Sequence, residues 1–321
     1  MPSFPVFPPA RACGSRNMRA ALLSLTALCV PAMALAQAED ADVVVLDNIV
    51  ITAAGFEQNI KEAPASISVI TAEELQKGNF TSLTDALKEV QGVVTTGTAN
   101  ESDIFIRGLP GQYTLILVDG KRQSTRDSRV NGNAGYEQSF IPPIAAIDRI
   151  EVVRGPMSSL YGSDAMGGVI NIITKPVADT WTGSVSVETV VQDEEGFENS
   201  RQTSFYASGP LVADVLGLQV WGRKLDQDAS SISGGPGGSD DYDLGARLTW
   251  HVDDQNQVLL EAGRTQITAE DYGDLGYRDH DRDHWSLTHK GSFADLDTEL
   301  SFSQETGERT SYSRTAAGAD F

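Results

Sequence analysis

The chain has 321 residues, of which 40% are hydrophobic and 21% charged, so it can bury a core and lacks the composition of a disordered protein. With 45 acidic against 24 basic residues its formal net charge is −21, which argues against nucleic-acid binding. Both cysteines, Cys13 and Cys29, lie near the N-terminus. We therefore expect neither a disulfide scaffold nor a Cys-ligated metal site in the rest of the chain.

Residues 18–38 have the pattern of a secretory signal. A short basic start precedes an apolar stretch at residues 20–30, and small residues in A-x-A spacing follow it. We place cleavage after Ala36 or Ala38 and treat residues 1–37 as the signal peptide with its upstream leader. No later apolar run reaches the roughly 18–20 residues of a membrane helix, so an exported chain of this kind enters a membrane only as a β-barrel.

Residues 38–62 are predicted to form an N-terminal linker. Its acidic start is followed by the β-branched run "DNIVITA", which begins at Asp47 and ends at Ala53. Such a run is typical of an edge strand. It is equally suited to capture by a partner through strand addition.

Residues 63–177 are predicted to form a compact α+β domain. Thr71 and Glu74 have the spacing of a capping box, which indicates a helix directly after a strand. The predicted elements are a strand at 66–71, helices after Thr71 and at 82–90, and β runs at 104–108 and 114–120, the last closed by an Asp-Gly turn. A long polar loop follows at 121–139, and such loops are usually functional or disordered.

The stretch "IDRIEVVRGPMSSLYGSDAMGGVINIITK", residues 147–175, predicts a strand, a Gly-Pro turn, a short helix, a Gly-rich turn and a buried strand. It contains no catalytic set, because Ser158 and Ser159 have no His at the spacing of a hydrolase motif. The chain also lacks a G-x-x-x-x-G-K-[ST] motif. We therefore expect a protein that is not an enzyme and that has no cofactor.

Residues 178–321 alternate polar and apolar residues in segments of about ten, which is the pattern of an outer-membrane barrel. A soluble sandwich also alternates, but the export signal and the aromatic positions favour the barrel. At about ten residues a strand plus connections, this region holds roughly six to eight strands. "DHDRDH", Asp279–His284, offers two histidines among carboxylates but no third strong ligand at fixed spacing, so we expect a solvated loop and no metal site.

Four segments together resemble the plug of TonB-dependent outer-membrane receptors, of the ferric catecholate siderophore and colicin I receptor type. These segments are "LDNIVITA", "FIRGL", "LILVDGKR" and "IDRIEVVRGPMSSLYGSDAMGGVINIITKP". The resemblance implies an α+β plug followed by a transmembrane antiparallel β-barrel of about 22 strands. Because residues 178–321 are too few for that barrel, the chain is expected to be truncated or a fragment.

The resemblance also implies three sets of functional residues. The TonB box comprises Asp47, Asn48, Ile49, Val50, Ile51, Thr52 and Ala53. Arg107 and Arg154, with Glu151 grouped beside them, are expected to anchor the plug, the two arginines by pairing with glutamates on the barrel wall. The ligand-facing plug loop is expected to present Arg126, Arg129, Tyr136 and Gln138.

The expected function is TonB-dependent uptake of a ferric siderophore, with a catecholate favoured, across the outer membrane of a Gram-negative bacterium. Vitamin B12, haem or another metal chelate are the alternatives within transport. A passive channel or a surface adhesin barrel is the alternative from another class. The expected partners are TonB with its inner-membrane complex, the ferric siderophore and outer-membrane lipid, with colicins or phage as further candidates and no nucleic acid.

Overall fold

The computed structural model describes residues 49–50, 58–61, 63, 65–78, 80, 82–98, 101–123, 139, 141–193, 196, 199–231, 237–270, 276–294 and 296–313. All of them fall in one compact unit, Asp47–Phe321.

A five-stranded sheet, which we call the plug sheet, organises the first part of this unit. Its strands lie in the order β3 (Ser66–Thr71), β8 (Ile147–Arg154), β9 (Gly168–Thr174), β6 (Thr114–Val118) and β7 (Lys121–Arg122). Neighbours pair antiparallel except β6 and β9, which are parallel. Two hairpins stand apart from it: β1 (Ile49–Val50) with β2 (Gln58–Asn59), and β4 (Val93–Thr98) with β5 (Glu101–Ile106). The sequence pattern predicted β3, β6, β8 and β9, whereas β4 was missed and β7 lies in the segment that was expected to be a loop from residue 121.

The helices around the plug sheet are short. They are α1 (Ala72–Lys77), α2 (Leu83–Leu87) and α3 (Ser158–Tyr161), with single 3-10 turns η1 (Gly111–Tyr113), η4 (Ile144–Ala146) and η5 (Ser163–Ala165). The capping box predicted for α1 is present, since the Thr71 hydroxyl accepts from the Glu74 amide and the Glu74 carboxylate accepts from the Thr71 amide. No helix in the described part of the chain is long and apolar enough to cross a membrane.

Aliphatic side chains from both faces of the plug sheet form its core. One cluster joins Leu75 of α1 and Leu87 of α2 to Ile150 and Ile172 in the sheet centre. A second cluster lies on the other face and contains Leu117, Val153 and Val169. Because β8 and β9 are covered on both faces, their buried runs lack simple alternation.

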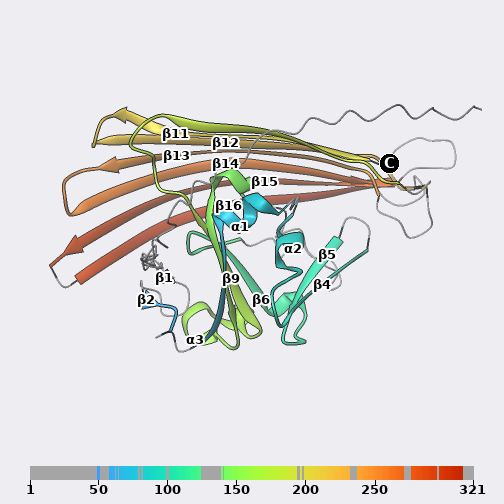
Figure 1. Ribbon diagram of the computed structural model, residues 1–321, viewed down its shortest axis with the longest axis horizontal. Helices are drawn as coiled ribbons and strands as arrows, with labels where there is room; N and C mark the ends of the chain where they lie inside the picture. Colours follow the sequence, from blue (N-terminus) through green and yellow to red (C-terminus); the bar gives the residue numbers. More distant parts are fainter. Residues whose placement is uncertain are drawn as a thin grey trace, which may run out of the picture. The chain divides into compact units, whose positions relative to one another are not determined.

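A seven-stranded antiparallel sheet, the barrel sheet, follows the plug (Figure 1). Its strands pair in chain order: β10 (Thr182–Val190), β11 (Ser200–Val212), β12 (Leu216–Gln227), β13 (Ser239–His251), β14 (Asn256–Glu270), β15 (Gly276–Phe293) and β16 (Leu296–Ser313). The number of strands lies within the six to eight expected from the length of this region.

The barrel sheet is apolar outside and polar inside, the reverse of a soluble sandwich. Exposed positions hold large apolar side chains: Val185, Val187, Phe205, Leu244, Trp250, Leu260, Trp285, Leu287, Leu300 and Phe302. The alternate, buried positions are largely polar: Gln202, Ser204, Gln219, Arg223, Asp243, Arg247, Glu261, Thr265, Arg282 and Thr288. A soluble sandwich would bury the first set and expose the second. This distribution therefore confirms the predicted barrel wall, with lipid outside and a polar lumen inside.

The expectation of a solvated loop at "DHDRDH" was wrong. Residues 279–284 lie inside β15, where His280 and Arg282 face the lumen and are almost fully buried. Both faces of this part of the strand carry polar side chains, so the apolar alternation that marks the other strands is missing. Among the described residues, no group of three His, Cys, Asp or Glu side chains can hold a metal ion.

Gly168 shows why the plug motif is rich in glycine. A Cβ placed there would lie 2.4 Å from the Val153 carbonyl oxygen and 2.8 Å from Ile106 Cδ1. Both atoms belong to the buried centre of the plug, so neither can move aside cheaply. Gly168 is thus needed for close packing between backbones, because the contact leaves no room for any side chain.

We predict that Gly168→Ala destabilises the plug by about 1–3 kcal/mol through overpacking. Gly307→Ala is the matched control, because a Cβ at Gly307 has no heavy atom within 4 Å. Urea titration of the full-length receptor in detergent measures both free energies of unfolding. Equal values for the two variants would show that the Gly168 contact imposes no packing constraint.

Candidate functional site

The Asp-Gly turn between β6 and β7 places one carboxylate of the plug where it can reach the barrel wall. Asp119 and Gly120 have φ values of 48° and 75°, the left-handed conformation that an Asn-Gly or Asp-Gly hairpin turn requires. The Asp119 carboxylate accepts two hydrogen bonds of 2.8 Å from Thr174, one from its amide and one from its hydroxyl. Asn171, buried in β9, accepts from the Gly120 amide at 3.1 Å. The turn is therefore held rigidly against the end of β9.

Arg247 of β13 connects this turn to the barrel sheet. Its guanidinium donates to the Asp119 carboxylate, to the Thr174 hydroxyl at 2.6 Å and to Glu261 of β14, where the Nε–Oε2 distance is 2.7 Å. Arg247 and Glu261 are register partners on neighbouring strands, so the barrel itself orients the guanidinium. Because the Arg247 side chain is only 7% exposed, these contacts are shielded from water.

The charges at this contact balance. Glu261 also lies 3.6 Å from the Lys121 ammonium of the plug and 3.7 Å from His284 Nε2 of β15. Two cations, Arg247 and Lys121, thus face two carboxylates, Asp119 and Glu261. We call this group of four residues the Arg247 contact. A buried charge is tolerated only when it is paired, so removing any one member leaves the others uncompensated.

Two further barrel arginines hold the two ends of residues 124–138. Arg282 of β15 donates to the Gln123 side chain and lies 3.0 Å from Glu305 of β16. Arg223 of β12 donates to the Ser139 carbonyl at 2.8 Å. Gln123 and Ser139 flank the segment in which the sequence places a ligand-facing loop. The barrel wall thus fixes where that segment starts and ends.

The linker after the plug is also attached to the barrel wall. Gln219 of β12 donates to the Lys175 carbonyl at 2.8 Å, and the Ala178 amide donates to the Ser208 hydroxyl of β11 at 3.0 Å. The Lys175 ammonium donates to the Ala145 carbonyl at 2.7 Å. Burial lowers the pKa of Lys175, although the nearby carboxylate of Asp148 acts in the opposite direction.

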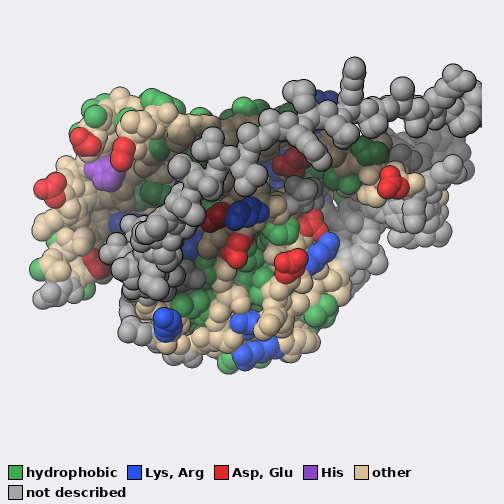
Figure 2. Space-filling model, in the orientation of Figure 1, with side chains coloured by type: hydrophobic (Ala, Val, Ile, Leu, Met, Phe, Trp, Pro, Cys, Tyr) green, Lys and Arg blue, Asp and Glu red, His purple; other side chains and the backbone are tan. Residues whose placement is uncertain are grey.

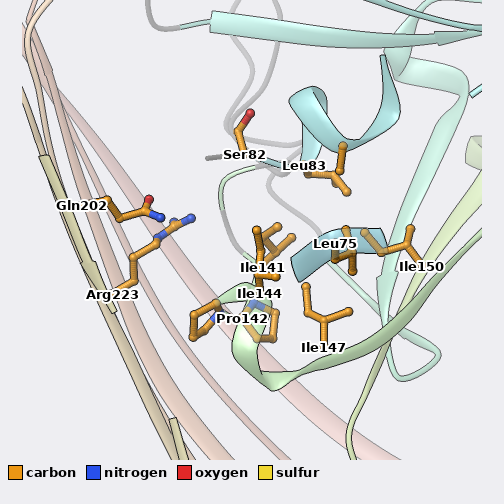
Figure 3. A pocket seen from close by; sticks show the side chains of 12 residues that line it. Leu75, Ser82, Leu83, Ile141, Pro142, Ile144, Ile147, Ile150, Gln202 and Arg223 are labelled. Atoms are coloured by element: carbon orange, nitrogen blue, oxygen red, sulfur yellow. The ribbon is translucent and has the colours of Figure 1, made fainter. Parts of the chain in front are cut away.

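An apolar part of the plug faces two polar side chains of the wall (Figure 3). Gln202 and Arg223 extend from the barrel strands toward Ile141 and Ile144 of the plug, around a small cavity of about 20 Å³. Both side chains are more than nine-tenths buried, and neither Gln202 Oε1 nor Arg223 Nε makes a hydrogen bond. The plug thus contacts β11 and β12 by packing as well as by polar bonds.

The surface charge of the described residues is mixed. Figure 2 shows acidic and basic side chains lying side by side on the face that it presents. The overall excess of acidic residues is therefore not gathered into a field of one sign on this face.

The structure places Arg107, Arg154 and Glu151 within the plug. The Arg154 guanidinium donates to the Gln91 carbonyl, and Glu151 is fully buried with Arg149 Nε at 2.9 Å. Arg107 lies beside Gly155 with a positive φ of 52°. Within the described residues, neither Arg107 nor Arg154 forms an ion pair with a barrel carboxylate, so their pairing with barrel glutamates stays a prediction.

The other predicted site residues fall mostly outside the described part of the chain. Of the TonB box, only Ile49 and Val50 are described, and their backbones pair with Asn59 and Gln58. Asp47, Asn48, Ile51, Thr52 and Ala53 lie outside it. So do Arg126, Arg129, Tyr136 and Gln138 of the predicted ligand-facing loop.

Sequence reasoning missed the Arg247 contact, although the residues of the plug and of the barrel that form it each lie in a recognisable sequence pattern. Asp119 stands in the predicted Asp-Gly turn, and Arg247 and Glu261 lie among apolar residues in alternating strands. An arginine on the polar face of a barrel strand requires a buried partner. The missing information was which plug residue reaches β13, because nothing local in the sequence specifies a contact across 128 residues.

Comparison with known proteins agrees with this architecture. The family described as TonB-dependent Receptor Plug Domain matches residues 59–169. The iron-regulated outer membrane virulence protein of Vibrio cholerae is 42% identical over 282 residues, which cover 82% of this chain and 43% of that protein. The crystal structure of the siderophore receptor PirA from Acinetobacter baumannii matches with a TM-score of 0.70 at 29% identity, covering 77% of this chain and 40% of that one.

A second similar structure holds a ligand. It is the ferric enterobactin receptor of Pseudomonas aeruginosa, a mutant in complex with enterobactin, with a TM-score of 0.70 and 26% identity over 79% of this chain and 42% of that one. The fold and these matches define a plugged outer-membrane barrel. The chain belongs to the TonB-dependent outer-membrane receptors, and it spans less than half the length of the relatives it matches.

We predict that Arg247→Gln destabilises the attachment of the plug by about 3–5 kcal/mol, because it leaves buried carboxylates without their cation. The matched control is Arg264→Gln on β14, whose guanidinium is 59% exposed and lies 3.7 Å from Asp281, and which should cost about 0–1 kcal/mol. Urea titration of the full-length receptor measures the loss of stability in both variants. Adding Glu261→Gln to Arg247→Gln should recover part of the loss. Equal costs for the two arginine variants would contradict this role of Arg247.

Proposed function

We propose that the complete receptor takes up a ferric siderophore, with a catecholate such as ferric enterobactin favoured. The observation that carries this proposal is a folded plug bonded to the lumenal face of barrel strands. Relatives described as an iron-regulated outer membrane protein, a siderophore receptor and a receptor in complex with enterobactin support the ligand class. Neither a passive channel nor an adhesin needs a plug fastened to the lumen by buried ion pairs.

The plug makes an external source of energy necessary. A pore closed by a domain that is held by the Arg247 contact opens only if work is done on that domain. The periplasm has no ATP, so the work comes from an inner-membrane partner. We infer that this partner is TonB and that it pairs with the box from Asp47 to Ala53 as an added strand. Ile49 and Val50 pair through their backbones with Asn59 and Gln58, so these two residues have the β conformation that strand addition uses.

The ligand itself is expected to be an anion. Ferric tris-catecholates carry a net charge of about −3 and present aromatic faces, so cations and aromatic rings are the groups that recognise them. Arg126, Arg129, Tyr136 and Gln138 provide such groups in one segment, and we propose that they face the ligand. The barrel arginines at Gln123 and Ser139 support this proposal, because they fix both ends of the segment.

The first test separates energised transport from binding. Ile49→Pro in the full-length receptor removes a backbone donor from the box, so we predict loss of ferric enterobactin uptake with unchanged binding. Radio-iron uptake by a receptor-deletion strain measures transport, and titration of the purified receptor measures affinity. Ile49→Val, which keeps the donor and the β-branched side chain, is the control and should retain uptake. Uptake that survives the proline would show that residues 47–53 are not the TonB box.

The second test concerns the ligand. Arg126→Ala combined with Arg129→Ala should lower the affinity for ferric enterobactin by about tenfold to a hundredfold, the loss of roughly 1–3 kcal/mol of charge-assisted contact. Arg264→Ala, which removes an exposed cation from the outer face of β14, is the control and should leave affinity unchanged. Titrations at low and moderate salt measure both. Unchanged affinity in the double variant would show that this loop does not recognise the anionic ligand.

A further inference from the structure

The small cavity between the plug and the barrel wall is polar on one side and apolar on the other. Its barrel side consists of Gln202 of β11 and Arg223 of β12 (Figure 3). Its plug side is apolar apart from Ser82 and includes Ile141 and Ile144. The cavity volume is about 20 Å³. A water molecule needs roughly 10–15 Å³ and at least two polar partners, so the cavity has room for one.

The two polar side chains offer this cavity one donor and one acceptor. Gln202 is 7% exposed and Arg223 is 8% exposed. Gln202 pairs in register with Leu225, so it is the diagonal neighbour of Arg223 on the lumenal face of the two strands. Among the described residues, neither Gln202 Oε1 nor Arg223 Nε has a hydrogen-bond partner. Leaving both groups unsatisfied costs free energy, which an occupant of the cavity that bonds to both recovers.

The charges around the cavity favour a neutral occupant. Arg223 lies directly opposite Asp243 of β13 in register, and Asp243 is also almost fully buried. The positive charge of Arg223 is therefore faced by a buried carboxylate and needs no anion from solution. A cation in the cavity would be repelled by the guanidinium, and an anion would be repelled by Gln202 Oε1. Water is neutral, and it both accepts and donates hydrogen bonds, as these two groups require.

We propose that one water molecule binds in this cavity and bridges the two side chains, accepting from Arg223 Nε and donating to Gln202 Oε1. A bridging water is enthalpically nearly as favourable as a direct hydrogen bond. The free energy lost by ordering one water molecule is smaller than that lost by leaving two buried polar groups unbonded. Gln202 thereby orients Arg223 through the water.

The orientation of Arg223 matters because its other end holds the plug. Its Nη2 donates to the Ser139 carbonyl at 2.8 Å, where residues 124–138 end. The guanidinium is planar and its N–H groups have fixed directions relative to one another, so a bond at Nε also sets the direction of Nη2. We therefore assign Gln202 as a positioning residue for the end of the ligand-facing loop. This assignment rests on the proposed function, whereas the water site does not.

A crystal structure of the full-length receptor, at a resolution that shows ordered water, tests the site. The expected result is one peak within about 3.2 Å of both Arg223 Nε and Gln202 Oε1. An empty cavity, with the Gln202 amide turned so that its oxygen bonds directly to Arg223, would overturn the proposal. So would a chloride ion at the peak, which crystals grown in bromide reveal by anomalous scattering.

Variants of Gln202 test its positioning role. Gln202→Met has nearly the same shape but no acceptor, so the peak should disappear and the Arg223–Ser139 bond should be lost. The affinity for ferric enterobactin should then fall about threefold to tenfold, the worth of one hydrogen bond. Gln202→Glu keeps an acceptor oxygen and should retain the affinity. Gln266→Met is the matched control, because Gln266 lies between the buried residues Thr265 and Ile267 of β14 and therefore points to the outer face.

The possible results separate the water site, the positioning role and the proposed function. A Gln202→Met receptor that keeps both the Arg223–Ser139 bond and its affinity would overturn the positioning role, as would an equal loss of affinity in Gln266→Met. If Gln202→Met does not reach the outer membrane, the structure of the unmodified receptor still decides the water site, and Gln202→Leu replaces it in the titration. Absence of ferric enterobactin binding by the unmodified receptor would instead overturn the proposed function, with the peak between Arg223 and Gln202 still expected.

Discussion

The attachment of the plug depends on one arginine, Arg247, which bonds to a carboxylate of the plug and to a carboxylate of its own barrel. Neither bond would be stable alone in a buried site, since a single buried ion pair barely recovers the free energy lost on leaving water. Here Asp119 is itself fixed by two bonds from Thr174, and Glu261 is shared with Lys121. Each group therefore enters the contact already oriented, so little conformational entropy is lost when it forms.

This constraint explains why the lumenal face of the barrel sheet is polar. A wall that packed against the plug through apolar side chains would join the two permanently, and the pore would stay closed. Hydrogen bonds and ion pairs can instead be exchanged for water when the plug moves, at a much smaller net cost. The outer face has the opposite requirement, because lipid offers no hydrogen bonds, and there large apolar side chains such as Leu287 and Phe302 are exposed. Because successive residues of a strand point to opposite faces, the alternation of polar and apolar residues in the sequence provides both the polar lumenal face and the apolar outer face.

Local signals predicted four of the five plug-sheet strands (all but β7), the capped helix α1, the Asp-Gly turn and the alternating barrel strands, because each depends on residues that are neighbours in the chain. Residues 279–284 were wrongly predicted to be a loop, because they have no alternating pattern that would indicate a strand. Their strand conformation results from pairing with β14 and β16. The Arg247 contact could not be predicted from the sequence, because it forms only where the folded plug docks on the folded barrel sheet. The TonB box and the ligand-facing loop rest on the family resemblance, and their roles remain proposals.

The Arg247 contact joins the turn between β6 and β7 of the plug to β13 and β14 by two ion pairs. The most direct measurement is hydrogen exchange of the backbone amides at residues 119–123 in the full-length receptor, compared with an Arg247→Gln variant. If the Arg247 contact holds the plug, these amides exchange slowly in the unmodified receptor and much faster in the variant, while amides of β3 and β8 keep their rates. Equal exchange at residues 119–123 in the two proteins would show that the plug is held elsewhere.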